Sequence, residues 1–201
     1  MAEASVHGCT CSVSRPAQPH TQPRTQSRNQ QPVYLTPNKR HTRHMSDTTK
    51  TLLIIAHAPS KNTSALRDAA LRGASHEDIE SVKVICKAPL DAGPEDVLNA
   101  DAILLGTTEN LGYIAGAMKD FFDRSYYPVL EEKQGLPCAI YIRAGHDGTG
   151  TRRALGSILT GLRWKLVQEP LICRGDWQDD FLQQVEDLGL YLSAGLDNGI
   201  F

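Results

Sequence analysis

The sequence lacks several features that would assign it to a major class of protein. It has no run of about 18 apolar residues, which excludes a membrane-spanning helix. It has no Gly-x-Ser-x-Gly turn of the kind that carries a hydrolase nucleophile. From residue 45 onward it has no pair of histidines at metal-binding spacing. The sequence therefore predicts neither a membrane protein, a serine hydrolase nor a histidine-based metalloenzyme.

Cysteine is scarce, and its number is odd. Three of the five cysteines, Cys86, Cys138 and Cys173, lie in apolar stretches. This placement favours buried free thiols in a reducing compartment over disulfides, so a cytoplasmic protein is expected. Cys9 and Cys11 form a single Cys-x-Cys in a polar segment, which is too little for a zinc site.

Charge is distributed unevenly along the chain. Residues 1–44 hold six Lys or Arg and one acidic residue, whereas residues 45–201 hold fifteen Lys or Arg and twenty-two Asp or Glu. The small net charge of −2 therefore hides a basic N-terminal segment and an acidic body. Nucleic-acid binding requires clustered Lys and Arg, so an acidic body argues against nucleic acid as its partner.

The first 48 residues differ in composition from the rest. Residues 1–44 hold five Pro and five Gln and almost no branched aliphatic residues, so we expect residues 1–48 to form a disordered tail. Two alternatives are open. The segment is rich in Arg, Ser and Thr, like an organelle transit peptide, although it shows no amphipathic apolar face. Alternatively, translation starts at Met45, just before the folded pattern. We expect one folded domain over residues 49–201.

Hydrophobic patterns in this region alternate between strand-like and helix-like segments. Unbroken apolar runs are typical of strands that are covered on both faces, as in a parallel sheet. Apolar residues at i, i+3 and i+4 indicate helices. Strands are predicted at 52–56, 82–85, 102–105, 138–142 and 166–173, the last interrupted by Pro170, and helices are predicted after Ser64, Gly116 and Thr151 and around 181–192. This order is that of a doubly wound α/β fold.

In such a sheet, ligands bind beyond the carboxyl ends of the strands, where three loops have unusual compositions. The first loop follows the strand at 52–56 and leads into a helix. The free N–H groups at a helix start, together with polar side chains and a cation, suit a phosphate monoester. The alternative is that these side chains only cap the helix. The candidate phosphate-binding residues are Ser60, Lys61, Asn62, Thr63 and Ser64.

The second loop begins at Gly106 and leads into the helix that carries Phe121 and Phe122. Residues 106–124 resemble the Gly-Thr/Ser-Pro-x-x-x-Gly-x-x-x-Gly-x-Leu-Lys-x-Phe-Phe/Ile-Asp-Arg stretch of flavodoxin-like NAD(P)H-dependent FMN and quinone reductases. The first loop, with Pro59 and Asn62, is similar to the phosphate loop of that family. The matching positions in the longer stretch are Gly106, Thr107, Gly112, Gly116, Lys119, Phe121, Phe122, Asp123 and Arg124.

The resemblance covers roughly residues 50–195 and implies a fold, a cofactor and a reaction. The fold would be a five-stranded parallel sheet of order 2-1-3-4-5 with helices on both faces. The cofactor would be FMN, with NAD(P)H as the electron donor. The flavin carries out the chemistry in such proteins, so no catalytic side chain is assigned. A homo-oligomer, either a dimer or a tetramer, is also implied.

The second and third loops would hold the flavin ring. Gly112 would let backbone approach a flat ring, and N–H groups near it could donate to the pyrimidine edge. In the third loop, several glycines allow a close approach to a ligand. His146 is either a proton donor, since histidine titrates near neutral pH, or a solvated loop histidine. The candidate ring-binding residues are Thr107, Thr108, Glu109, Asn110, Leu111, Gly112 and Tyr113 in the second loop, and Ala144, Gly145, His146 and Gly148 in the third.

Three functions remain open at this point. The leading hypothesis is an FMN-dependent oxidoreductase that passes electrons from NAD(P)H to a quinone, a flavin or another small acceptor. The second is an electron-transfer flavoprotein without its own NAD(P)H site. The third is an interaction module of this fold that has lost the cofactor, because Thr108 and Asn110 replace the Pro and the aromatic residue of the family pattern.

Overall fold

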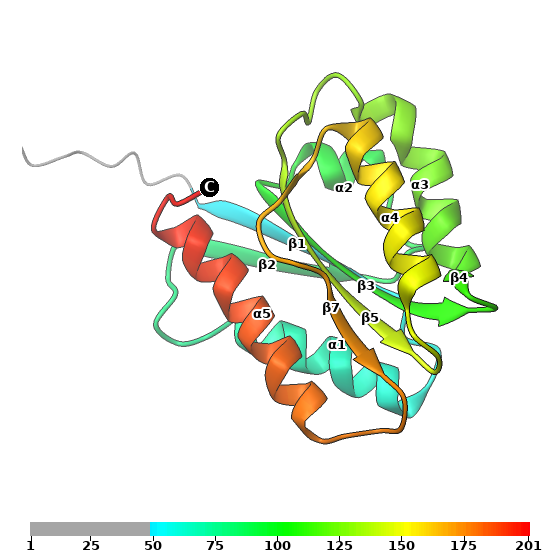
Figure 1. Ribbon diagram of the computed structural model, residues 1–201. Coiled ribbons are helices and arrows are strands. Elements are labelled where there is room, and N and C mark those ends of the chain that lie inside the picture. The colour runs from blue at the N-terminus through cyan, green and yellow to red at the C-terminus, as the bar shows by residue number, and fades with distance from the viewer. Residues whose placement is uncertain (1–48) are drawn as a thin grey trace, which may run out of the picture. The chain divides into compact units, whose positions relative to one another are not determined.

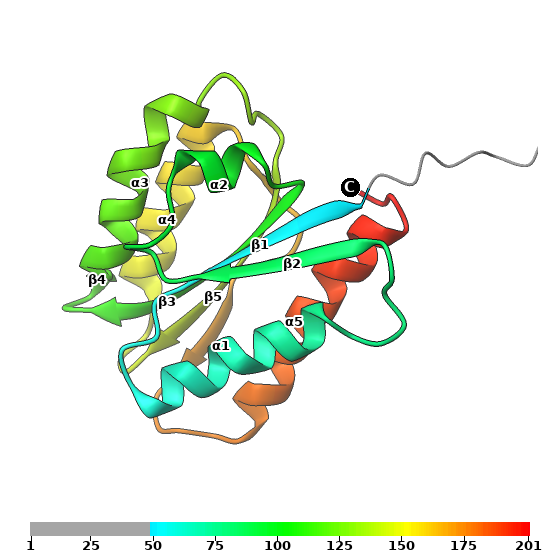
Figure 2. The ribbon, with the colours of Figure 1, turned by 180° about the vertical axis from the view of Figure 1, so that it is seen from behind.

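A computed structural model describes residues 49–201, and the predictions for residues 1–48 lie outside the described residues. The described part is a parallel sheet with helices on both faces (Figures 1 and 2). The strands are β1 (Lys50–Ala56), β2 (Val82–Lys87), β3 (Ala102–Asn110), β4 (Tyr113–Ile114), β5 (Pro137–Ala144), β6 (Lys165–Leu166) and β7 (Leu171–Arg174). The helices are α1 (Lys61–Ala74), α2 (Pro94–Leu98), α3 (Gly116–Val129), α4 (Thr149–Leu162) and α5 (Asp180–Asp197).

The strand order confirms the predicted topology. The sheet runs β2-β1-β3-β5, and β6 and β7 both pair with β5 in parallel register. These two short strands form the predicted fifth strand, which is divided at residues 167–170 because Pro170 cannot donate a ladder hydrogen bond. The antiparallel pairing of β4 with β3 adds a hairpin that the sequence patterns did not predict. No helix within residues 49–201 is long and apolar enough to span a membrane.

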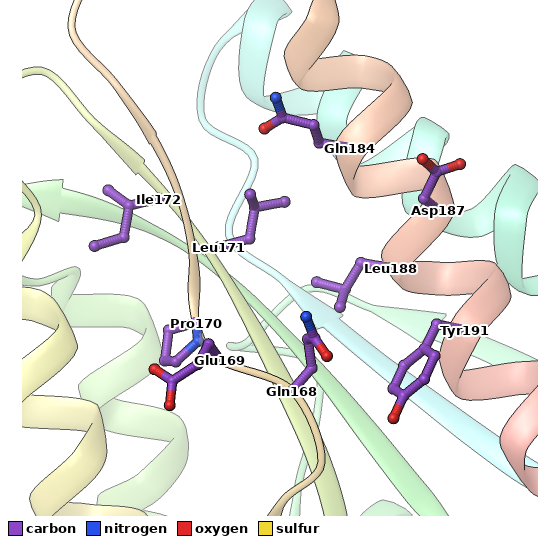
Figure 3. A pocket seen from close by; sticks show the side chains of 9 residues that line it. All are labelled: Gln168, Glu169, Pro170, Leu171, Ile172, Gln184, Asp187, Leu188 and Tyr191. Carbon is purple, nitrogen blue, oxygen red and sulfur yellow. The ribbon is translucent and has the colours of Figure 1, made fainter.

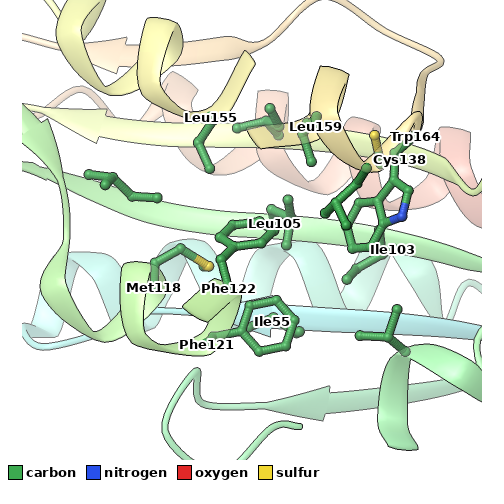
Figure 4. Close-up of a cluster of buried hydrophobic side chains, with 14 of the residues drawn as sticks. Ile55, Ile103, Leu105, Met118, Phe121, Phe122, Cys138, Leu155, Leu159 and Trp164 are labelled. Atoms are coloured by element: carbon green, nitrogen blue, oxygen red, sulfur yellow. The ribbon is translucent and has the colours of Figure 1, made fainter. Parts of the chain in front are cut away.

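Each strand contributes alternate side chains to two separate cores. In β1, Leu53 and Ile55 lie in the core beneath α2, α3 and α4, whereas Leu52 and Ile54 lie in the core beneath α1 and α5. This alternation explains why the predicted strands are apolar throughout. Figure 4 shows the first core, in which Phe122 of α3 packs against Trp164 with ring centroids 6.2 Å apart. Trp164 therefore has a packing role in this core.

The second core contains a close pairing between two neighbouring strands. Gly106 of β3 lies opposite Tyr141 of β5 in the register. A Cβ on Gly106 would overlap the ring of Tyr141, so only glycine leaves room for this side chain. Tyr141 is almost fully buried, and burial raises the pKa of its hydroxyl far above the ordinary value. The phenol is therefore neutral at any physiological pH.

Short-range interactions between neighbouring residues stabilise the helices. α1 begins at Lys61, earlier than the pattern after Ser64 indicated, because Ser60 and Thr63 form a capping box. α2 was not predicted from the pattern, although Pro94 at its start is a recognised helix signal. In α3, Lys119 and Asp123 form an i, i+4 ion pair, at 2.5 Å.

The three described cysteines are free thiols, as predicted. Burial raises the pKa of Cys138 to about 12 and that of Cys173 to about 11. The pKa of Cys86 is also raised by burial. These thiols are therefore protonated near neutral pH and act as small apolar side chains.

Candidate functional site

Three loops follow the carboxyl ends of β1, β3 and β5, which are adjacent parallel strands. Figure 1 shows the start of α1, the β3–β4 hairpin and the loop after β5 at the same edge of the sheet. The chain passes from β1 outward to β2 on one side and continues to β3 on the other, so the winding direction reverses here. This is the position at which open α/β sheets bind ligands. The structure thus brings the three predicted loops together.

In the first loop, two of the five candidate residues serve as helix caps. The hydroxyl of Ser60 accepts from the Thr63 amide at 3.3 Å, and the Thr63 hydroxyl accepts from the Ser60 amide at 2.9 Å. Thr63 is buried, and its hydroxyl lies 3.0 Å from the Ser60 hydroxyl. The capping alternative considered for the sequence is therefore observed for Ser60 and Thr63.

The other three candidates of this loop remain available to a ligand to different degrees. Lys61 and Asn62 are exposed, and no group among the described residues accepts from their backbone N–H groups. Ser64 is half-buried, and its hydroxyl donates to the Ala58 carbonyl at 3.5 Å. The first turn of α1 holds no acidic residue. Two free amides and one cation therefore lie at the positive end of a 14-residue helix.

His57 connects the first loop to β3. Its backbone amide donates to the Gly106 carbonyl at 2.8 Å, which fixes the end of β1 against the neighbouring strand. The imidazole is partly buried, and this burial lowers the pKa of His57 below the ordinary value. The ring is therefore neutral near pH 7.

The second loop is shorter than predicted because β3 continues past Gly106. Thr107 and Thr108 are buried residues of this strand. The Thr107 hydroxyl donates to the Thr108 carbonyl at 3.3 Å, and the Thr108 hydroxyl donates to the Asn110 side chain at 2.8 Å. The glycine at 106 accommodates Tyr141 and does not end the strand. The predicted strand end at Gly106 is therefore wrong.

The tip of the hairpin is a two-residue turn made by Leu111 and Gly112. Both residues have positive φ angles, 54° for Leu111 and 72° for Gly112. This is the geometry of a tight hairpin turn that matches the twist of the strands, although leucine adopts it rarely. The Leu111 side chain is fully exposed, and the Tyr113 side chain is about half exposed at 49%. No described residue accepts from the amides of Leu111 or Gly112.

A carboxylate joins the second and third loops. Glu109 accepts from the amides of His146 and Gly148, each at 3.1 Å. The two loops are thus held together by two hydrogen bonds to a charged acceptor, which are stronger than neutral ones. The sequence patterns placed Glu109 among the cofactor contacts, and the structure shows its carboxylate occupied by the third loop.

The third loop begins as predicted, at the buried end of β5. Ala144 is buried in the strand, Gly145 and His146 are exposed, and Gly148 caps α4 with a φ of 73°. Asp147 accepts from the Thr149 amide at 2.9 Å, and this hydrogen bond lowers the pKa of the carboxyl group. The side chain of His146 is 89% exposed, so no buried partner orients its ring. Its role as a proton donor stays a prediction.

A cavity of about 370 Å³ adjoins this edge on the side of β2. Its lining includes Ala56 and Ala58 next to the first loop, together with Arg67 and Lys87. Both cations are already paired, Arg67 with Asp68 and Lys87 with Asp96. The cavity is therefore close to electrically neutral. Among the described residues, no group of three His, Cys, Asp or Glu side chains is arranged to hold a metal ion.

Solved structures of known proteins have the same arrangement of strands and helices. The chain matches a flavodoxin from the domain Archaea with a TM-score of 0.62 and 20% identity, over 73% of this chain and 98% of the other. It matches a flavodoxin, WrbA-like protein from Agrobacterium tumefaciens with a TM-score of 0.58 and 16% identity, over 73% and 96%. The chain has a flavodoxin-like fold.

Further comparisons extend this likeness. An apo NADH:FMN oxidoreductase matches with a TM-score of 0.58 and 16% identity, over 73% of this chain and 90% of the other. In sequence, 111 residues are 32% identical to a flavodoxin of Aquifex aeolicus (strain VF5), which is 55% of this chain. The matched region spans 59% of that relative's length. No family model matches the sequence.

One residue that stabilises this flavodoxin-like edge was missed in the sequence. Arg143, at the end of β5, donates to the carbonyls of Ala144, Cys173 and Gly175 and lies 5.7 Å from the centroid of the Phe181 ring. It therefore ties the ends of β5 and β7 together beside the third loop. The signal was a single arginine at the end of an otherwise apolar strand, because a cation withdrawn in part from water needs several acceptors.

Proposed function

We propose that this chain is an FMN-dependent oxidoreductase that passes electrons from NAD(P)H to a quinone, a flavin or another small acceptor. The single observation that carries the proposal is the set of free donors at the switch point of the sheet. They are the amides of Lys61 and Asn62 at the start of α1 and those of Leu111 and Gly112 at the hairpin tip. A phosphate-bearing ligand with a polar flat ring would satisfy both groups.

The start of α1 fits the phosphate of FMN. The two free amides and the Lys61 ammonium group offer donors and positive charge to a doubly charged anion. The absence of acidic residues from the first turn of α1 removes the repulsion that would oppose such binding. Asn62 adds a side-chain amide that can donate to a phosphate oxygen. Ser60 and Thr63 would support the loop through their capping box.

The hairpin and the third loop fit a flat heteroaromatic ring. The amides of Leu111 and Gly112 would donate to pyrimidine oxygens or nitrogens, and Gly112 has no side chain to obstruct the approach. Glu109 would hold both loops in place, so that the ring meets a preformed surface. Bound FMN supplies the redox chemistry, because its ring accepts a hydride and donates electrons. The side chains here bind and orient, and none is assigned as an acid or a base.

A second candidate function is electron transfer without an NAD(P)H site. The flavodoxin of Aquifex aeolicus, 32% identical over 111 residues, favours this candidate. The stretch from Gly106 to Arg124, which resembles the reductase family, favours the reductase. Both candidates require FMN, and only the reductase requires a place for nicotinamide.

The visible spectrum of the purified chain and its consumption of NAD(P)H test the proposal together. A yellow protein that oxidises NADH or NADPH in the presence of a soluble quinone would support the reductase. A yellow protein that oxidises neither nucleotide would contradict the reductase and support the electron carrier. A colourless protein that does not quench the fluorescence of added FMN would contradict both functions and leave the interaction module. The homo-oligomer predicted from the resemblance is tested by light scattering.

A further inference from the structure

A groove of about 410 Å³ lies between β7 and α5. Figure 3 shows Leu171 of β7 and Leu188 of α5 facing each other across it, with Tyr191 beyond them. Gln184 and Asp187 of α5 stand along one side. The remaining lining comes from the segment that links β6 to β7, namely Gln168, Glu169 and Pro170, and from Ile172. The groove thus combines an apolar floor with polar and acidic borders.

The outer edge of β7 is open along this groove. β7 pairs with β5 on one side, and no described strand pairs with its other side. The Gly175 amide donates to the Ala144 carbonyl, so residue 175 faces β5. Backbone groups alternate in direction along a strand, so Cys173 also faces β5 whereas Ile172 and Arg174 face outward. The outward N–H and C=O groups of these two residues are free to pair with another extended chain.

The charge around the groove is acidic on the side of α5. Residues 175–201 contain six Asp or Glu and no Lys or Arg. Glu186 is paired with Arg72, and Glu169 is paired with Arg152. Asp187 makes no ion pair within the described residues, and its carboxylate accepts only from the Gln183 side chain at 2.8 Å. An occupant with positive charge would therefore gain an unneutralised partner in Asp187.

A second copy of this chain is a poor occupant because its own α5 is acidic. Edge-to-edge pairing of two copies through β7 would bring two acidic α5 helices towards each other, and like charges across an interface oppose association. We propose that the groove binds an extended, cationic peptide segment of another protein, which adds a strand to β7. Main-chain hydrogen bonds to Ile172 and Arg174 would supply affinity, as in other complexes formed by strand addition.

The groove also specifies the pattern of the peptide. Alternate side chains of an added strand would point toward α5. Among these, an aliphatic residue would cover Leu171 and Leu188, and a neighbouring Lys or Arg would approach Asp187. Gln184 and Gln168 could bond to polar groups at the ends of the segment. The preferred sequence therefore alternates, with cationic, aliphatic and cationic residues on one face.

The test uses a dye-labelled peptide, Thr-Arg-Thr-Val-Thr-Arg-Thr, blocked at both ends, with fluorescence anisotropy as the readout. We expect the full chain to bind this peptide. The matched peptide with Glu in place of Arg should bind at least about tenfold more weakly. Asp187→Lys should raise Kd about tenfold, because it replaces an attraction by a repulsion. Asp91→Lys, on the opposite side of the sheet near α2, makes the same change of charge and should leave Kd unchanged.

Two further measurements separate strand addition from simple charge attraction. A peptide N-methylated at alternate amides keeps its charge but cannot pair with β7, so its binding should be lost. Circular dichroism of Asp187→Lys checks that the variant is folded. The proposal is overturned if the N-methylated peptide binds as well as its parent, if Asp187→Lys binds normally, or if the wild-type chain does not bind. It is also overturned if dimerisation of the chain, measured as a doubling of mass in light scattering, displaces the peptide. A second copy would then be the occupant.

Discussion

Gly150, in the first turn of α4, lies directly against the carbonyl oxygen of Gly112 at the tip of the β3–β4 hairpin. A Cβ on Gly150 would overlap that oxygen, and backbone cannot rotate aside as a flexible side chain can. The hairpin and α4 are therefore fitted together at a point where one added methyl group must move one of them.

Gly150→Ala should displace the hairpin and weaken FMN binding about tenfold, because the amides of Leu111 and Gly112 would move from their positions. Fluorescence quenching of FMN measures the affinity, and circular dichroism checks the fold. Gly156→Ala is the matched control, since it lies in the same helix with open space around it. It should raise the free energy of unfolding by up to about 1 kcal/mol and leave FMN affinity unchanged. Equal FMN affinity in both variants would remove the hairpin from the site.

Glu109→Ala should release the third loop from the hairpin. Two charge-assisted hydrogen bonds are lost, so the amides of His146 and Gly148 should exchange with solvent faster even without FMN. Affinity for FMN should fall as well, because the third loop would no longer be held in place beside the flavin ring. Glu132→Ala, an exposed carboxylate in another loop, is the control for hydrogen exchange and for affinity. Unchanged exchange at His146 and Gly148 would contradict the clamp.

The first loop should distinguish FMN from riboflavin, which has the same ring without the phosphate. Hydrogen bonds to a charged group contribute about 1.5–3 kcal/mol each, so FMN should bind on the order of a hundredfold more tightly. Lys61→Gln combined with Asn62→Ala should reduce this preference, although the backbone amides of both residues remain, and should leave riboflavin affinity unchanged. Ser60→Ala should instead lower the free energy of unfolding by about 1 kcal/mol, because it removes the cap. Equal affinities of the wild-type chain for the two flavins would refute phosphate binding here.

The stability of the domain should depend on pH through His57. Burial lowers the pKa of His57 in the folded state, so the unfolded chain binds more protons between that lowered pKa and about 6.5. The free energy of unfolding should therefore fall as pH is lowered from about 7 through this window. His57→Asn should flatten the decline in Tm between pH 7 and pH 5.5. His76→Gln, an exposed residue after α1, is the control and should show the decline of the wild-type chain.

The main features of the fold could be predicted because they depend on patterns that repeat along the sequence. The run Leu52–Ala56 is apolar at every position because the strand is covered on both faces. The helical periodicity of Leu155, Ile158 and Leu159 marks a face that packs on the sheet. Pro170 correctly indicated an interrupted edge strand, since proline cannot complete a ladder.

The details of the candidate site could not be predicted because they depend on contacts between distant segments. Gly106 was interpreted as the end of a strand, and only the position of Tyr141 shows why a glycine lies within β3. The carboxylate of Glu109 meets amides 37 and 39 residues further along the chain, and no local pattern signals such a contact. The roles of Lys61 and Asn62 toward FMN, like those of the other candidate residues, stay predictions.

The fit of Tyr141 against Gly106 has a consequence for how this sequence can vary. Any residue larger than glycine at position 106 requires a smaller one at position 141, so position 106 cannot change while the tyrosine is kept. In an alignment of proteins that share this sheet, the two columns should covary, with an aromatic residue at the second only where glycine occupies the first. In a library randomised at both positions, folded variants should lack the combination of a larger residue at 106 with an aromatic residue at 141.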